Sequence, residues 1–231
     1  MASHGDIFFA HKQWAGKGQR GKTWASLPGE NIIMSAVLEP VFLSVTRQFP
    51  LSACVALACH DLYSRYVPLG QTSIKWPNDL MFGNRKLGGI LTELSSELDR
   101  IHFAVLGMGI NVNSTAADLP PELAAGAVSM REVLGKRLPR AALAVDLWGR
   151  LERWINLHAE QGFGPVRVAW KELCGMLGQP VLIQTGKKQV CGIAEDIDES
   201  GALIVRDRAG AKERVVAGDV EQISGERVRR D

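Results

Sequence analysis

The sequence has few of the features that mark nucleic-acid-binding, membrane-spanning or exported proteins. Its net charge is only +2 over 231 residues, which is too small to favour nucleic acid as the main partner. The longest apolar runs fall far short of the roughly 20 residues that a membrane span requires. The N-terminus has no charged segment followed by an apolar one, as an export signal would. We therefore expect a cytoplasmic protein that binds neither nucleic acid nor membrane.

Cysteine and histidine are sparse and follow no ligand or catalytic pattern. The cysteines have no CxxC spacing and mostly lie among apolar neighbours, which favours reduced core thiols over disulfides or zinc. They are Cys54, Cys59, Cys174 and Cys191. The five histidines are scattered, so no metal cluster and no nucleophile–histidine pair is indicated. A hydrolase is therefore poorly supported.

Acidic residues are absent from Ile7 to Gly29, and this stretch contains a basic, glycine-rich segment. Three glycines and three cations fall within the nine residues Gly16–Trp24, between the strand-like runs Ile7–Ala10 and Ile32–Leu38. Glycine lets the backbone approach an anion closely, so successive N–H groups can converge on a phosphate or carboxylate while the cations supply charge. A solvated basic hairpin tip has the same composition, so this loop alone does not establish an anion site.

A second motif combines a chain reversal with charged side chains. The residues Lys-Trp-Pro-Asn-Asp at 75–79 follow a strand-like run and turn the chain, and a further Gly-Asn turn leads into Arg85–Leu91. The resulting antiparallel strands place Lys75, Asp79 and Lys86 in one small sheet, where the side chains of one face converge. The motif therefore predicts a compact cluster of charged groups.

A third motif ends in an asparagine. The strand-like run Ile101–Leu106 leads into a glycine-rich segment that reaches Asn111, whose amide can both donate and accept hydrogen bonds. Taken singly, Asn78, Asp79 and Asn111 are most simply explained as turn caps. Three such motifs in this order are hard to explain in that way.

Together the motifs resemble those of biotin–protein ligases, which activate biotin with ATP and attach it to a lysine of a biotin carboxyl carrier protein. Lys75–Asp79 followed by Lys86–Leu91 is close to diagnostic, and the resemblance extends from about Phe8 to Ile223. It implies ATP, Mg²⁺ and biotin as ligands and, as partner, a carrier protein such as an acetyl-CoA carboxylase subunit. It leaves open a homodimer formed through the central sheet.

The resemblance also implies an α/β (α+β) fold in two domains. Residues 1–177 would form a catalytic domain with a mixed or antiparallel sheet, related to class II aminoacyl-tRNA synthetases. Residues 178–225 would form a small SH3-like C-terminal β-barrel, and 226–231 a charged tail.

Apolar periodicity predicts helices first and short strands later. Helices are expected over 50–66, 139–160 and 165–177, each with one apolar face, and a short helix is expected from Ser129. After Gly178, runs separated by glycine turns predict the strands of the small barrel. These runs are 181–184, 189–196, 202–207, 212–217 and 220–223.

Carried over residue by residue, the resemblance implies roles for the motif residues. Lys86 would bridge the biotin carboxylate and the α-phosphate, and Arg20 and Asp79 are the other catalytic candidates. Asp79 would also face Mg²⁺ and help to deprotonate the acceptor lysine. Biotin would contact Gln13, Gly16, Lys17, Lys86, Gly88, Gly89 and Leu91. ATP and the adenylate would contact Lys17, Gly18, Gln19, Arg20, Gly21, Lys22, Trp24, Lys75, Asn78, Asp79 and Asn111.

The sequence departs from the family pattern in two places. Many relatives carry arginine where this loop has Gln19, so biotinyl-AMP is expected to be held less tightly here. Relatives also have an N-terminal helix and a Ser-Thr-Asn-type segment that helps to form the biotin pocket. Because Met1 lies just before the first strand, we expect that segment to be missing, together with any N-terminal DNA-binding domain.

Two other functions stay open. One is a lipoate or octanoyl ligase or transferase, against which the motifs at 75–79 and 86–91 and the predicted barrel argue. The other is an N-terminally truncated, non-catalytic ligand-binding remnant. Biotin binding without pyrophosphate release would indicate the remnant.

Overall fold

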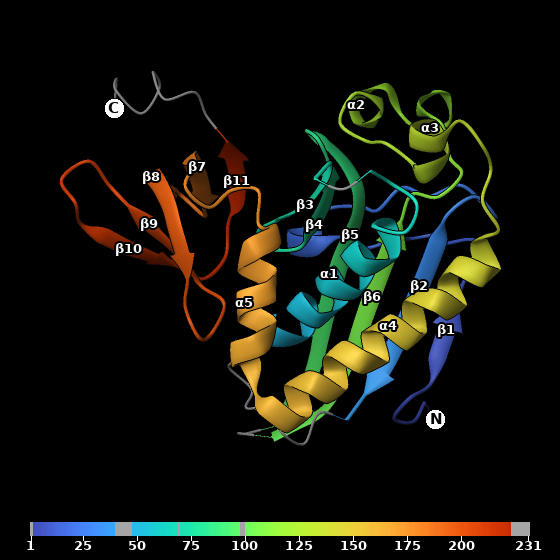
Figure 1. The fold of residues 1–231 in the computed structure, drawn as a ribbon, viewed down its shortest axis with the longest axis horizontal. Coiled ribbons are helices and arrows are strands. Elements are labelled where there is room, and N and C mark those ends of the chain that lie inside the picture. The colour runs from blue at the N-terminus through green and yellow to red at the C-terminus, as the bar shows by residue number, and fades with distance from the viewer. Residues whose placement is uncertain (1, 40–47, 69, 98–99, 223–231) are drawn as a thin grey trace.

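The chain forms two antiparallel sheets with helices packed on and beside the larger one (Figure 1). This architecture comes from a computed structural model, which describes residues 2–39, 48–68, 70–97 and 100–222. In Figure 1 helices α1 and α4 cross one face of the larger sheet, and α5 stands between that sheet and the smaller one. The predicted combination of an α/β unit followed by a β unit is confirmed.

The larger sheet has six strands in the order β1-β2-β6-β5-β4-β3. All of its pairings are antiparallel. The chain reversal predicted at 75–79 is confirmed, because Lys75 and Asp79 are directly opposite each other across the β3–β4 pair. The strands are β1 (Ile7–Phe9), β2 (Ile32–Leu38), β3 (Thr72–Lys75), β4 (Asp79–Phe82), β5 (Arg85–Glu97) and β6 (Arg100–Ile110).

Strand β6 differs from its prediction. We expected it to end at Leu106 and to give way to a glycine-rich segment, but it continues to Ile110 with Gly107 and Gly109 inside it. Both glycines pair with β5, Gly107 with Leu91 and Gly109 with Gly89. The glycines therefore belong to the middle of the sheet, where a missing side chain leaves space above a strand.

Helix α1 (Phe49–Tyr63) is buried on every side, not only on the predicted apolar face. Every residue from Leu51 to Cys59 is buried, because the helix lies between the sheet, α4 (Arg140–Gln161) and α5 (Phe163–Leu173). A helix that is apolar all round is typical of such a position. Helix α5 ends at Leu173, earlier than predicted, and residues 174–177 lead into the smaller sheet.

Two short helices, α2 (Pro121–Ala124) and α3 (Met130–Leu134), follow β6. The predicted start at Ser129 is confirmed, since its hydroxyl accepts a hydrogen bond from the backbone N–H of Glu132 at 3.2 Å. The Glu132 carboxylate accepts the N–H of Ser129 in return. This capping box fixes where α3 begins.

The cysteines are free thiols, as predicted. Cys54, Cys59 and Cys174 are buried in the core, and burial raises the pKa of each of these thiols. A thiol with a raised pKa stays protonated and unreactive at neutral pH. Over the described residues, no helix is both long and apolar enough to cross a membrane.

The smaller sheet has five antiparallel strands in the order β10-β9-β8-β7-β11. Its strands coincide closely with the predicted runs. They are β7 (Pro180–Thr185), β8 (Lys188–Ile197), β9 (Leu203–Arg206), β10 (Lys212–Val215) and β11 (Asp219–Gln222). Apolar side chains of these strands point inward, Val181, Ile183 and Leu203 among them.

The turn at Gly201 joins the smaller sheet to the larger unit. The buried indole of Trp76 donates a hydrogen bond to the Gly201 carbonyl at 3.0 Å. Any side chain at position 201 would collide with the Phe49 ring. The contacts of Gly201 with Trp76 and Phe49 hold the smaller sheet against the start of α1. In this position β11 lies near the glycine-rich loop.

Candidate active site

A cavity of about 540 Å³ lies where the glycine-rich loop, the strands β3–β6 and the start of β11 meet. Most of the predicted site residues line it, although they come from distant parts of the sequence. They are Gln13, Lys17, Gly18, Gln19, Lys22, Trp24, Lys75, Asn78, Asp79, Lys86, Gly89, Leu91 and Asn111. The fold therefore brings all three sequence motifs to one hollow.

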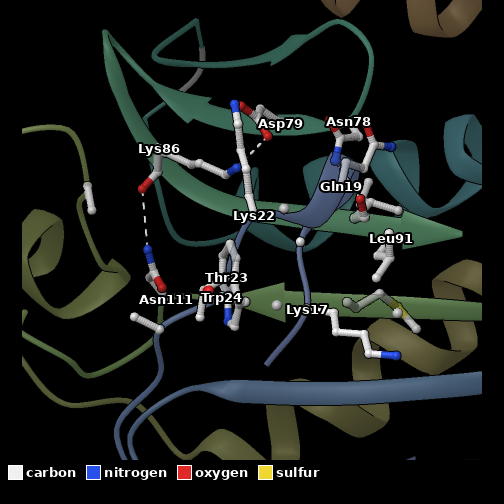
Figure 2. A pocket seen from close by; sticks show the side chains of 18 of the residues that line it. Lys17, Gln19, Lys22, Thr23, Trp24, Asn78, Asp79, Lys86, Leu91 and Asn111 are labelled. Carbon is white, nitrogen blue, oxygen red and sulfur yellow. Dashed lines mark hydrogen bonds and ion pairs between the residues drawn. The ribbon is translucent and has the colours of Figure 1, made fainter. Parts of the chain in front are cut away.

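The side chains of Lys86 and Asp79 form an ion pair in this cavity (Figure 2). The Lys86 Nζ lies 2.5 Å from the Asp79 Oδ1, and 5.5 Å from the centre of the Trp24 ring, within reach of a cation–π interaction. Lys86 is 34% exposed and Asp79 25%, so both groups remain open to the cavity. The convergence predicted for strands β4 and β5 is confirmed.

Trp24 lies on a pair of glycines. Gly89 of β5 and Gly109 of β6 are directly opposite each other, and a Cβ at either would lie within 3.0 Å of the indole, at Gly109 only 2.5 Å away. Only the absence of both side chains lets the indole approach the sheet so closely at this point. The indole Nε1 is buried and has no hydrogen-bond partner among the described residues, so it is free to donate to a ligand.

Asn111 is held in a fixed orientation at the end of β6. Its Nδ2 donates to the Lys86 carbonyl at 3.3 Å, and its Oδ1 accepts from the Asn31 amide at 3.5 Å. Asn31 is completely buried and its Oδ1 accepts the N–H of Val112 at 3.0 Å. Asn31 was missed in the sequence analysis, because an asparagine after Gly-Glu reads locally as a turn residue.

Asn78 joins the chain reversal at 75–79 to β5 by hydrogen bonds. Its Nδ2 donates to the Ile90 carbonyl at 2.6 Å, and its own carbonyl accepts the Ile90 N–H at 3.0 Å. These two bonds fix the position of the neighbouring Asp79. In this structure Asn78 thus supports the turn while also lining the cavity.

The glycine-rich loop closes on itself as a narrow hairpin. Lys17 pairs with Thr23, and the Gly18 N–H donates to the Lys22 carbonyl at 2.7 Å. Gly16 is required at the base, because a Cβ there would collide with the Trp24 carbonyl oxygen. The buried Oε1 of Gln13, beside Gly16, has no hydrogen-bond partner among the described residues. A ligand N–H could occupy that acceptor.

Some predicted site residues do not line the cavity. Arg20, a catalytic candidate, has a left-handed backbone, with φ 57°, and its guanidinium donates to the Gln184 carbonyl of β7 at 3.2 Å. It lines a neighbouring cavity instead. Gly21 and Gly16 contribute only to the loop backbone. Gly88 faces the helix-covered side, where a Cβ would meet the Tyr63 hydroxyl at 2.9 Å.

Two segments of the cavity wall were not predicted. Residues around α2 line one side of the cavity, and Gly218, Asp219 and Val220 line another. These residues, in α2 and on either side of it, are Leu119, Glu122, Leu123, Gly126 and Ala127. Nothing in their local pattern indicates a ligand site, because the parallel bridge between Lys86 and Ala127, a long-range contact, brings this segment to β5.

The cavity carries both signs of charge. Its cations are Lys17, Lys22, Lys75 and Lys86, and its carboxylates are Asp79, Glu93, Glu122 and Asp219. Among the described residues no three His, Cys, Asp or Glu side chains are grouped so that they could hold a metal ion. The four lysines suit an anionic ligand.

Comparison with known proteins gives two family matches. Residues 2–111 match the biotin/lipoate A/B protein ligase family, and residues 176–221 match the biotin protein ligase C-terminal domain. Both ranges contain cavity residues. The second range coincides with the smaller sheet.

Individual relatives agree with these matches. A biotin–[acetyl-CoA-carboxylase] ligase of Paracoccus denitrificans is 33% identical over 204 residues, covering 87% of this chain and 84% of the relative. The bifunctional ligase/repressor BirA of Bacillus spizizenii is 33% identical over 221 residues, covering 95% of this chain and 67% of the relative. The fold resembles that of a biotin protein ligase from Aquifex aeolicus in complex with biotin and ATP, with a TM-score of 0.84, 23% identity and coverage of 96% and 91% of the two chains.

Proposed function

The chain belongs to the biotin/lipoate A/B protein ligase family, and on this premise we propose how its cavity performs the reaction of a biotin–protein ligase. Biotin and ATP first form biotinyl-5′-AMP and pyrophosphate. A lysine of a biotin carboxyl carrier protein then takes the biotin, and AMP leaves. The observation that carries this proposal is the Lys86–Asp79 pair, which lies in the cavity beside Trp24 and a basic loop.

In the first step a carboxylate oxygen of biotin attacks the α-phosphorus of ATP, and the bond from that phosphorus to the pyrophosphate oxygen breaks. Two anions must approach each other, so a cation between them lowers the barrier. Lys86 is suited to this role because its ammonium is partly exposed to the cavity and its flexible stem can follow the moving charge. Lys17, Lys22 and Lys75 surround the same space.

Mg²⁺ would enter with the nucleotide. The lack of a three-ligand cluster among the described residues fits an ion that is held mostly by phosphate oxygens and water. Asp79 is the carboxylate beside Lys86 and would supply the protein ligand. The ion would neutralise phosphate charge, while Lys86 acts on the reacting oxygens.

In the second step the ε-amine of the carrier lysine attacks the carbonyl carbon of the mixed anhydride. A C–N bond forms, and the bond from the carbonyl carbon to the AMP oxygen breaks. The amine must be neutral to attack, and Asp79 is placed to accept the proton it loses. The same carboxylate is available because Lys86, its partner, is drawn to the adenylate.

The two substrates would occupy different ends of the cavity. The unpaired Gln13 Oε1 offers an acceptor for the ureido N–H groups of biotin, and Gly89 and Leu91 line the same cavity. Trp24 and Asn111 would contact the adenylate. We further propose residues 1–177 as the catalytic domain and 178–225 as an SH3-like domain.

Biotin-dependent exchange of ATP with labelled pyrophosphate, in the presence of Mg²⁺, tests the proposed function. We expect exchange with biotin and much less with lipoate or octanoate, because the second family match is to a domain of biotin protein ligases. Equal exchange with lipoate would indicate the lipoate branch of the family. Biotin binding without exchange from a folded chain would indicate a non-catalytic remnant.

Gln19→Arg is expected to slow the leakage of biotinyl-AMP from the protein by about tenfold, because a charge-assisted contact to the adenylate is worth about 1.5–3 kcal/mol. Gln19 lines both neighbouring cavities, so a longer cationic side chain can reach the phosphate end. The measurement is the release rate of radiolabelled biotinyl-AMP after gel filtration. Gln189→Arg, which adds the same charge to an exposed position of β8, is the control. Equal rates for wild type and Gln19→Arg would contradict the prediction.

A further inference from the structure

Strand β11 of the smaller sheet begins at the edge of the cavity. Its first residue, Asp219, lies opposite Gln184 of β7 and lines the cavity together with Gly218 and Val220. The Asp219 side chain is 51% exposed, so it is directed into the open space and not into the core of the smaller sheet. The cavity thus contains a carboxylate that the smaller sheet supplies.

This carboxylate is bound to the cations of the glycine-rich loop. The Lys22 Nζ lies 2.6 Å from the Asp219 Oδ1, and the Arg20 Nη1 lies 3.5 Å from its Oδ2. The hydrogen bond from Lys22, followed by the charges of Lys22, Arg20 and Lys75, lowers the pKa of Asp219 below its ordinary value. Asp219 is therefore fully ionised at neutral pH.

Arg20 is fixed from two sides. Besides Asp219, its Nη1 contacts the Gln184 carbonyl at 3.2 Å, and its left-handed backbone turns the side chain toward β7 and β11. The tip of the loop is itself closed by the Gly18–Lys22 hydrogen bond. Lys22 and Arg20 therefore have defined partners within the chain, and these partners belong to the smaller sheet.

We infer that Asp219 pairs with the same two cations, Lys22 and Arg20, that would bind the phosphate oxygens of ATP. The nucleotide must then displace Asp219 from these cations to bind. This inference rests on the proposed function. A phosphate oxygen and a carboxylate oxygen compete for the same ammonium donors, and two anions cannot share Lys22 at hydrogen-bond distance without repulsion. Asp219 is a positioning residue: it holds the loop through Lys22 and Arg20 and lowers the affinity for the nucleotide.

The competition is reciprocal. If pairing with Asp219 weakens ATP binding, then ATP binding weakens the pairing by the same factor. Arrival of the nucleotide would thereby detach the tip of the loop from the smaller sheet. Biotin, for which we propose the other end of the cavity, would bind without disturbing Asp219.

Asp219→Asn tests the inference, because the amide keeps the shape of the side chain and removes its charge. Binding of Mg²⁺ with α,β-methylene-ATP is measured by calorimetry in the presence of saturating biotin, so that no adenylate forms. We expect the variant to bind this analogue about threefold to tenfold more tightly than the wild type, since exposed ion pairs contribute modestly. The affinity for biotin should not change.

Two further variants identify the cause of any change in affinity for the ATP analogue. Glu213→Gln removes the same charge from β10, where Glu213 pairs with Lys188 on the same sheet, and its affinity for the analogue should equal that of the wild type. In a Lys22→Gln background, Asp219→Asn should tighten binding much less, because the nearer of the two cations over which the anions compete is gone and only Arg20 is left.

Any of the following three results would overturn the inference. Unchanged or weaker binding by Asp219→Asn, with normal biotin-dependent exchange in the wild type, would show that Asp219 does not compete with the nucleotide and would leave the proposed function intact. An equal gain in the Lys22→Gln background would assign the effect to long-range charge. Absence of binding in every protein, with no exchange in the wild type, would overturn both proposals together.

Discussion

Lys86→Ala is expected to reduce biotin-dependent pyrophosphate exchange by at least about 100-fold, because removal of one preorganised group that stabilises a charged transition state commonly costs that much or more. The Nζ of Lys86 is the cation that stands beside Asp79 and Trp24 in the cavity. The fold should survive, since the side chain is one-third exposed and belongs to no core cluster. Exchange rate and thermal unfolding are the two measurements.

A paired lysine outside the cavity is the matched control for Lys86. Lys212 pairs with Glu195 at 3.0 Å on the smaller sheet, and Lys212→Ala should exchange at the wild-type rate. Lys86→Arg keeps the charge but changes the geometry of the donors, and we expect most of the activity to be lost in it as well. Near-normal exchange by Lys86→Ala would remove Lys86 from the chemical step.

Gly109→Ala is expected to raise the KM for ATP by about tenfold. The new methyl group would lie 2.5 Å from the Trp24 ring, which must then leave its place on the Gly89–Gly109 pair, and an aromatic contact is worth about 0.5–1.5 kcal/mol beyond its buried area. The KM for ATP in the exchange reaction is measured with biotin saturating. Gly149→Ala, on α4 where nothing lies within 4 Å of the added methyl group, should leave the KM unchanged.

A second substitution shows whether the effect of Gly109→Ala acts through Trp24. If displacement of the indole is the cause, Gly109→Ala should cost nothing further in a protein that already carries Trp24→Ala. Additive losses would mean that the methyl group disturbs β6 itself. An unchanged KM in the single variant would show that the indole is dispensable for the nucleotide.

Local sequence patterns predicted most elements and the gathering of the three motifs. Alternating and helical periodicity depend only on which face is buried, and the strands of the smaller sheet are separated by clear glycine turns. Periodicity fails where burial is not one-sided. Helix α1 is covered on every side by the sheet, α4 and α5, and only its lack of charged residues before Asp61 indicates this.

Glycine was the least reliable residue for predicting where a strand ends. A glycine that ends a strand and a glycine that makes room for a distant side chain look alike in the sequence. Gly107 and Gly109 suggested that β6 ends at Leu106, whereas Gly109 is needed because Trp24 approaches from another part of the chain. Gly88 and Gly89 are adjacent but face opposite sides of the sheet. One accommodates Tyr63 and the other Trp24.

The charged pair in the cavity was predicted because a strand pairing determines its position. The β4–β5 pairing brings Asp79 to Lys86, and both belong to one sequence motif. The partners of Arg20 were not predicted, because Gln184 and Asp219 belong to the smaller sheet. No pattern within the loop reveals a contact of this kind.

The contribution of Gly218, Asp219 and Val220 to the cavity wall has a consequence for how the protein is made. Ribosomal synthesis proceeds from the amino end, so the glycine-rich loop, Lys86 and Asn111 emerge well before β11 does. A nascent chain can form the larger sheet early, yet its cavity lacks one wall until translation has passed Val220. The assembled site therefore appears only after β11 has been made and has paired with β7, and a chain interrupted before Gly218 would carry Lys86 without this part of the cavity wall.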